Sequence, residues 1–312
     1  MIIAQAHVSL PISRCRGNLA MDLGDVLEDK DFPALYRSAN AYSLSSQATF
    51  FRVLRTHLVL LVVAAAFSVI NRPEWWMGDF QVACLLGALG CSIYLFAKRP
   101  DQAWYAGRAV AESIKTSTWR YVCRAEPFLL DDAKARNGFK LRLKEIFEQN
   151  REVVGALSES LDGAAISTAM DALRRQPLVE RQTVYAKYRV ADQLTWYAGK
   201  AAHNKKCAKA FFWGLVVVNG LAVVCAVLRV TFGTMPWPTD VFVAAAASVL
   251  TWMQARRFSE LASSYALAAF EIGIVQDEVM LATTDDAFSI FVGDAENAFS
   301  REHTQWVARK DV

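Results

Sequence analysis

Two long stretches without a charged residue constrain this chain more than any other feature. They read FQVACLLGALGCSIYLFA over residues 80–97 and AFFWGLVVVNGLAVVCAVL over residues 210–228. Each approaches the roughly 20 apolar residues that a helix needs to cross a bilayer core. A shorter apolar run is paired with each across a short turn, at residues 58–70 and 241–253. Paired runs must cross the same thickness, so we predict an all-α membrane protein with two transmembrane hairpins, four spans and long cytoplasmic helices.

The shorter runs alone would also suit buried helices of a soluble protein, so we turn to the flanking residues. Trp75, Trp76 and Trp237 lie in the turns, and Trp213 and Trp252 lie near the opposite ends, where interfacial aromatic residues are expected. The turns hold only two cations, Arg72 and Arg229, whereas the open ends of the hairpins carry nine: Arg52, Arg55, Lys98, Arg99, Lys205, Lys206, Lys209, Arg256 and Arg257. By the positive-inside rule, we expect a multi-pass protein of the cell membrane with both termini cytoplasmic.

Composition argues against several other classes of protein. The apolar fraction is 54%, above the roughly 45–50% of soluble domains, and the net charge is only +3. We therefore expect the lipid bilayer, and not nucleic acid, as a partner. Six cysteines without paired spacing and four scattered histidines predict no metal site. No nucleophile elbow, phosphate-binding loop or metalloprotease motif is present, so we expect neither a cofactor nor enzymatic activity. The N-terminus does not resemble a signal peptide.

The segments between the hairpins are expected to be helical. Pro100 suits a first helical turn, residues 141–157 form an amphipathic pattern, and no strong break interrupts Val179 to Leu228. Thr284 is placed to cap a last helix.

A polar and aromatic stripe follows the first hairpin. Its residues, spaced 4, 4, 3 and 4, are Trp104, Arg108, Glu112, Lys115 and Trp119, and they share one helical face. A similar stripe containing Trp196 and Lys200 precedes the third run, where WYAGKAA echoes the earlier WYAGRAV. These stripes either form solvated ion-pair faces or dock on another helix. We predict that the 104–119 stripe docks on the C-terminal helix, through Glu302, His303 and Trp306, and that Trp196 and Lys200 also dock on a cytoplasmic helix.

Asn219 is the one strongly polar side chain in the middle of a span. Such a residue either lines a pore or forms a hydrogen bond between helices. Small residues at 244–248, including Ala245 and Ala246, would let helices approach closely. The alternative is that they are ordinary alanine content without meaning for an oligomer.

Three segments carry a resemblance to a known family. RPDQAWYAGRAVAESIKTSTWRY…AEPF, from residue 99 to residue 128, resembles the signature of one branch of the bacterial SLATT family. These are two-transmembrane effectors associated with SMODS nucleotidyltransferases and SLOG sensor domains. YRVADQLTWYAGKAAHNKKCAKAFFW and FSREHTQWVARK resemble the signature of a second branch, and the resemblance as a whole covers roughly residues 31–310.

The resemblance implies an organisation and a function. The expected parts are a poorly ordered N-terminal segment (residues 1–30), a first two-transmembrane unit (31–165) and a second one (166–312). The implied function is that of a membrane effector in bacterial conflict or anti-phage systems. It would act as an oligomeric pore released by a sensor protein or a nucleotide second messenger. The alternative is a non-conducting membrane scaffold that binds a cytoplasmic partner.

Overall fold

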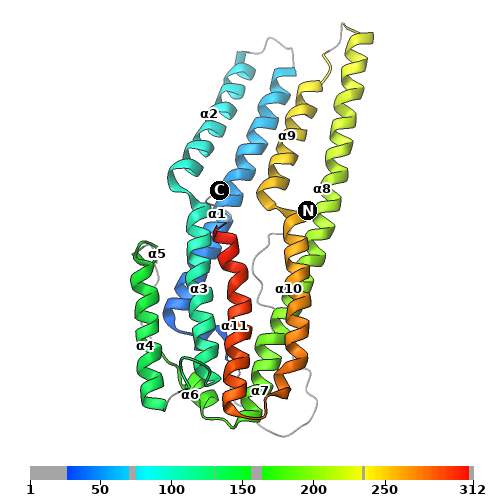
Figure 1. The fold of residues 1–312 in the computed structure, drawn as a ribbon. Coiled ribbons are helices and arrows are strands. Elements are labelled where there is room, and N and C mark those ends of the chain that lie inside the picture. Colours follow the sequence, from blue (N-terminus) through cyan, green and yellow to red (C-terminus); the bar gives the residue numbers. More distant parts are fainter. Residues whose placement is uncertain (1–26, 70–74, 130, 156–163, 234–235, 309–312) are drawn as a thin grey trace. The chain divides into compact units, whose positions relative to one another are not determined.

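The computed structural model describes residues 27–69, 75–129, 131–155, 164–233 and 236–308, with the backbone alone for residues 75, 152, 154 and 300–308. Residues 1–26 lie outside this description. The described part of the chain is helical and contains no strand, which confirms the expected all-α class. Figure 1 labels the α-helices. Three short helical turns carry no label and are described below with their neighbours.

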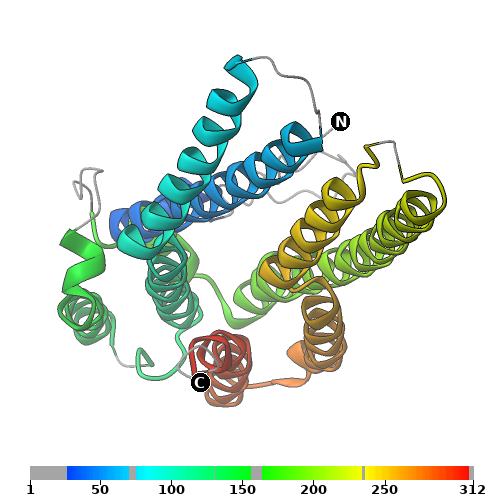
Figure 2. The same ribbon diagram turned by 90° about the horizontal axis from the view of Figure 1, so that it is seen from above.

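Four helices are long and apolar enough to cross a membrane, as expected from the four runs. The first hairpin joins α1 (Ala34–Val69) to α2 (Trp75–Lys98), and the second joins α8 (Ala191–Thr231) to α9 (Thr239–Arg256). Each hairpin is an antiparallel pair in Figures 1 and 2. Their outward side chains are apolar and exposed, such as Leu86 on α2 and Val217 on α8, as lipid contact requires.

The other helices begin and end for local reasons. α3 (Pro100–Val122) begins at a proline, whose missing N–H is not needed in a first turn. α4 (Asp132–Gln149) begins where Asp131 accepts a hydrogen bond from the Lys134 N–H, at 2.8 Å. α6 (Thr168–Arg174) is capped by Ser167, and α7 (Leu178–Tyr185) follows Pro177. A π-helical turn (Ala186–Val190) connects α7 to α8, so the chain is helical from Leu178 to Thr231.

After the second hairpin come α10 (Phe258–Glu278), a 3₁₀ turn (Val279–Leu281) and α11 (Asp285–Ala308). Thr284 caps α11 as expected, by accepting a hydrogen bond from the Ala287 N–H at 3.2 Å. One helix differs from its expected bounds. We expected residues 141–157, but α4 ends at Gln149, because Asn150 leaves the helical conformation and donates to the Ile146 carbonyl; α5 (Arg151–Gly155) then begins anew.

The chain forms two compact units that interleave along the sequence. The helical unit comprises residues up to Ser46, Ala103–Tyr185 and Ala282 onward. The hairpin unit comprises Gln47–Gln102 and Ala186–Leu281. Preceding α1, a short 3₁₀ turn (Asp29–Asp31) also belongs to the helical unit. These units are a different partition from the sequence units expected at 31–165 and 166–312, which stay a prediction.

Candidate functional site

The first hairpin is held by polar contacts of His57 with Ala88 and Ser92 and by close packing. The His57 Nδ1 lies 2.9 Å from the Ala88 carbonyl oxygen, which joins α1 to α2. A Cβ added at Gly87 would lie 3.1 Å from the Leu60 side chain, tighter than an ordinary contact. Close approach through glycine is how helices pack in lipid, where no hydrophobic force drives them together.

Aromatic and cationic side chains join the two hairpins within the hairpin unit. The rings of Phe51 on α1 and Trp252 on α9 meet edge to face, with centroids 5.7 Å apart. The Arg256 guanidinium lies 3.9 Å from the Phe51 ring centroid and 4.9 Å from that of Trp252. A desolvated cation over aromatic faces is a favourable contact, so the two hairpins are fastened at the end where α9 leaves the span.

The candidate residues within the spans lie in different surroundings. Asn219 is exposed on α8, and its side-chain amide donates to the Leu215 carbonyl of the same helix at 2.9 Å. Ala245 is half-buried, whereas Ala246 is buried and so faces its own chain. The next residue, Ala247, is exposed. Asn219 and Ala247 are therefore available to a neighbouring molecule, and Ala246 is not.

The stripe on α3 divides into two parts in the structure. Arg108 and Glu112 form an ion pair with each other across one helical turn, at 2.7 Å. Trp119 is buried, and its ring meets that of Tyr185 edge to face at 5.8 Å. Trp104 and Lys115 are half-buried. The side chains of Glu302, His303 and Trp306 lie outside the described residues, so their docking with this stripe stays a prediction.

Trp196 and Lys200 belong to the hairpin unit. The Trp196 ring packs against Tyr265 of α10, with centroids 5.5 Å apart, and the Lys200 ammonium lies 5.7 Å from the Trp196 centroid. This stripe therefore faces α10 of its own unit.

α11 does pack on α3, through residues that the sequence did not single out. Thr116 donates to the fully buried Glu296 carboxylate at 2.9 Å, and Tyr185 of α7 donates to its other oxygen at 3.1 Å. Arg120 donates to Asn297 at 2.8 Å and to the Gly293 carbonyl at 3.0 Å. A buried carboxylate needs such partners, so these bonds fix the register of α11 on α3 and α7.

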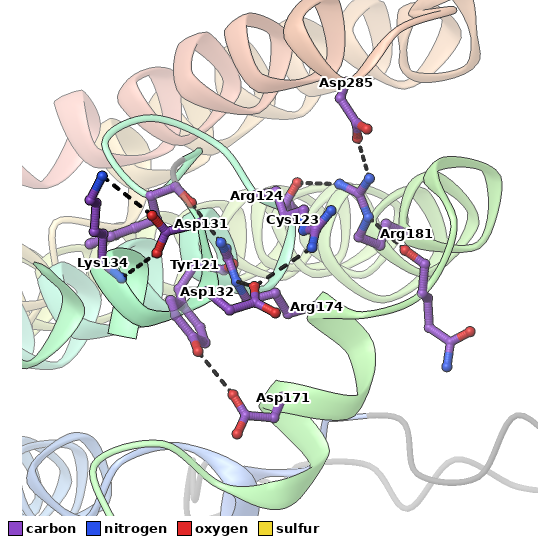
Figure 3. A network of polar contacts seen from close by, with 12 residues as sticks. Tyr121, Cys123, Arg124, Asp131, Asp132, Lys134, Asp171, Arg174, Arg181 and Asp285 are labelled. Carbon is purple, nitrogen blue, oxygen red and sulfur yellow. Dashed lines mark hydrogen bonds and ion pairs between the residues drawn. The ribbon is translucent and has the colours of Figure 1, made fainter. Parts of the chain in front are cut away.

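Two buried arginines hold the chain where α3 ends (Figure 3). Arg174 donates to the Tyr121 carbonyl at 2.7 Å, the Phe128 carbonyl at 3.0 Å and the Asp132 carboxylate at 2.9 Å. Carbonyls at the end of a helix lack partners within it and carry partial negative charge, so a guanidinium suits them well.

Arg181 serves the same end of α3 from α7. It donates to the Cys123 carbonyl at 2.7 Å and the Gln176 carbonyl at 3.0 Å, and it pairs with Asp285 at the start of α11. We call Arg174 and Arg181 the arginine clamp. Together they connect α3, α6, α7 and α11 within the helical unit.

The clamp also sets the protonation of its carboxylate partner. Burial acts to raise the pKa of Asp132. The hydrogen bond and charge of Arg174, together with the charge of Arg124, outweigh this effect, so the pKa lies below its usual 3.8. Burial also lowers the pKa of the Arg174 guanidinium from its usual value. The lowered pKa keeps the Asp132 carboxylate ionised at neutral pH, where it forms an ion pair with Arg174.

Sequence reasoning missed the clamp because arginine is rarely buried and is read as a surface residue. The available signal was the spacing of seven in RRQPLVER, which puts Arg174 and Arg181 on either side of a proline. Among the described residues, no three His, Cys, Asp or Glu side chains gather as metal ligands would.

Comparison with known proteins gives two matches in tandem. The family model described as SMODS and SLOG-associating 2TM effector domain 3 matches residues 33–182. The model described as SMODS and SLOG-associating 2TM effector domain 1 matches residues 185–306. No curated protein and no solved structure matches. Each match contains one of the two hairpins. The chain therefore belongs to the SLATT family of two-transmembrane membrane effectors, with a domain of type 3 followed by a domain of type 1.

Proposed function

We propose that this protein is an effector of a bacterial conflict or anti-phage system that forms an oligomeric pore in the cell membrane. A sensor protein or a nucleotide second messenger releases it, and it performs no enzymatic step. The family descriptions of both matched regions support an effector role in a membrane. The four apolar helices support integral membrane insertion.

The exposure of Asn219 within an apolar span is the main observation in favour of a pore. Asn219 lies in the apolar run of α8 but is exposed on the outside of its own chain. Its bond to Leu215 uses one amide hydrogen, while the side chain can donate two and accept two. Polar groups inside a membrane face a bundle interior or a water-filled path, because lipid offers them no partner. One chain has too few spans to enclose a wide path, so several copies would have to supply it.

Ion flux from vesicles containing the purified protein tests this function. We expect Asn219→Leu to reduce flux severalfold and Asn219→Gln, which keeps the amide, to retain most of it. Val217→Leu changes a neighbouring exposed apolar residue of the same helix and should behave like the parent. Equal insertion of all four proteins must be checked by carbonate extraction.

The alternative is a membrane scaffold that does not conduct and whose helical unit binds a cytoplasmic partner. The polar anchoring of α11 by Glu296 and the arginine clamp suits a rigid docking platform. If the parent protein and Asn219→Leu are equally silent in flux under activating conditions, the scaffold replaces the pore.

A further inference from the structure

α10 has two apolar faces, and the described residues cover only one of them. The covered face repeats every seven residues: Phe258 and Ile272 are buried, and Tyr265 contacts Trp196 and Tyr197 of α8. The other face carries Leu267, Phe270 and Ile274, which are 59%, 69% and 51% exposed. Large apolar side chains clustered on an exposed face indicate a contact surface.

Lipid is a poor occupant for this second face. α10 leaves the second hairpin at Arg257 and runs antiparallel to α8, because Phe258 stacks on Phe211 at 5.3 Å while Tyr265 meets Trp196 farther from the span. At 1.5 Å per residue, Phe270 lies about 18 Å along the helix from Phe258. The exposed face therefore extends away from the hydrocarbon, and a protein helix suits it better.

The spacing of this face fits a coiled-coil seam. Leu267, Phe270 and Ile274 are separated by three and four residues, as are the a and d positions of a heptad. Phe258, Tyr265 and Ile272 then occupy the opposite f position, which agrees with the contacts of Phe258 and Tyr265 to α8 and with the burial of Ile272. We call Leu267, Phe270 and Ile274 the α10 seam.

The charges beside the seam select the direction of a partner. Glu271 and Glu278 occupy one flank (the e positions), and Gly273 and Met280 occupy the other (the g positions). In a parallel pair, the e flank of one helix meets the g flank of the next, so each glutamate faces an uncharged residue. In an antiparallel pair the glutamates would face each other. Copies anchored in one membrane share their orientation, so the same helix from two copies meets in parallel.

We propose that the α10 seam is the contact through which two copies of this chain pair outside the membrane. The proposal deepens the proposed function, because it names the surface that holds the assembly, and it rests on copies meeting in one membrane. Asp277 occupies the next d position, where two like charges would meet. These like charges weaken the pair at that end of the seam.

Disulfide formation in membranes of expressing cells tests the seam. Leu267→Cys, Phe270→Cys and Ile274→Cys are each oxidised, beside Gln276→Cys as the control, which is exposed on the same helix away from the seam. We expect covalent dimers at the three seam positions, several times above Gln276→Cys. The unsubstituted chain gives the background of the native cysteines. Adding Asp277→Asn to Ile274→Cys should raise the dimer yield, because it removes the like charges.

Three results would overturn the seam: equal yields at all four positions, no dimer above background, or seam cysteines that neither cross-link nor react with a thiol reagent. The last result would mean that another part of the same chain covers the face. Flux without seam dimers would reject the seam and leave the pore. Seam dimers without flux would reject the pore and leave the seam.

Discussion

At the scale of the residue, Arg174 shows how much of the helical unit depends on one buried cation. Its guanidinium satisfies two carbonyls and one carboxylate, and its side chain is only 1% exposed. We expect Arg174→Met to lower the free energy of unfolding by about 3 kcal/mol, because the Phe128 carbonyl, the Tyr121 carbonyl and the Asp132 carboxylate lose the guanidinium that donates to them.

The adjacent Arg175 provides the matched control, because it is exposed. Arg175→Met should change stability by less than about 0.5 kcal/mol. Thermal unfolding in detergent, followed by circular dichroism, compares the two. Equal stability of both variants would show that the clamp contributes little.

At the scale of the element, the repeated motif WYAG occurs in two different environments. Gly107 on α3 lies against α1, where an added Cβ would meet the Ala39 carbonyl oxygen and the Ser43 nitrogen, each at 3.2 Å. Gly199 on α8 has no such neighbour within 4 Å. Gly107→Ala should therefore destabilise the protein by about 1–3 kcal/mol, since backbone cannot yield easily. Gly199→Ala should be neutral or stabilising by up to about 1 kcal/mol, because alanine favours helix.

The same detergent melts measure this pair, and both variants carry the same chemical change in the same motif. A lower melting temperature for Gly199→Ala than for Gly107→Ala would contradict the assigned packing of α1 on α3.

Elements were predictable from sequence where the cause is local. A bilayer demands uncharged runs, so the spans at 80–97 and 210–228 could be identified directly, and Pro100 and Thr284 marked helix starts by their own chemistry. The end of α4 at Asn150 was not predictable. It depends on the Asn150 side-chain amide, which binds the Ile146 carbonyl that a continuing helix would have used for a backbone hydrogen bond. The burial of Arg174 and Glu296 depends on partners 42 to 180 residues away, which no local pattern reveals.

At the scale of the whole molecule, the charge distribution predicts which side of the membrane each part occupies. Asp79 and Asp240 are exposed near the turns, and Ser259 is exposed on α10 beyond the cationic ends of the hairpins. In spheroplasts, a membrane-impermeant maleimide should label Asp79→Cys and Asp240→Cys. It should label Ser259→Cys only after lysis, because the positive-inside rule places that end in the cytoplasm. Labelling of Ser259→Cys in intact spheroplasts would invert the proposed topology.

The interleaved helical unit has a consequence for biosynthesis. A chain is made from its N-terminus, at about 5–20 residues per second, and its parts fold as they emerge from the ribosome. All four spans have been translated before the first residue of α11. Until Glu296 and Asp285 leave the exit tunnel, their hydrogen bonds and ion pair with Thr116, Tyr185 and Arg181 cannot form. The membrane portion can therefore be inserted while the helical unit is still incomplete, and the synthesis of α11 determines when these contacts of the unit can form.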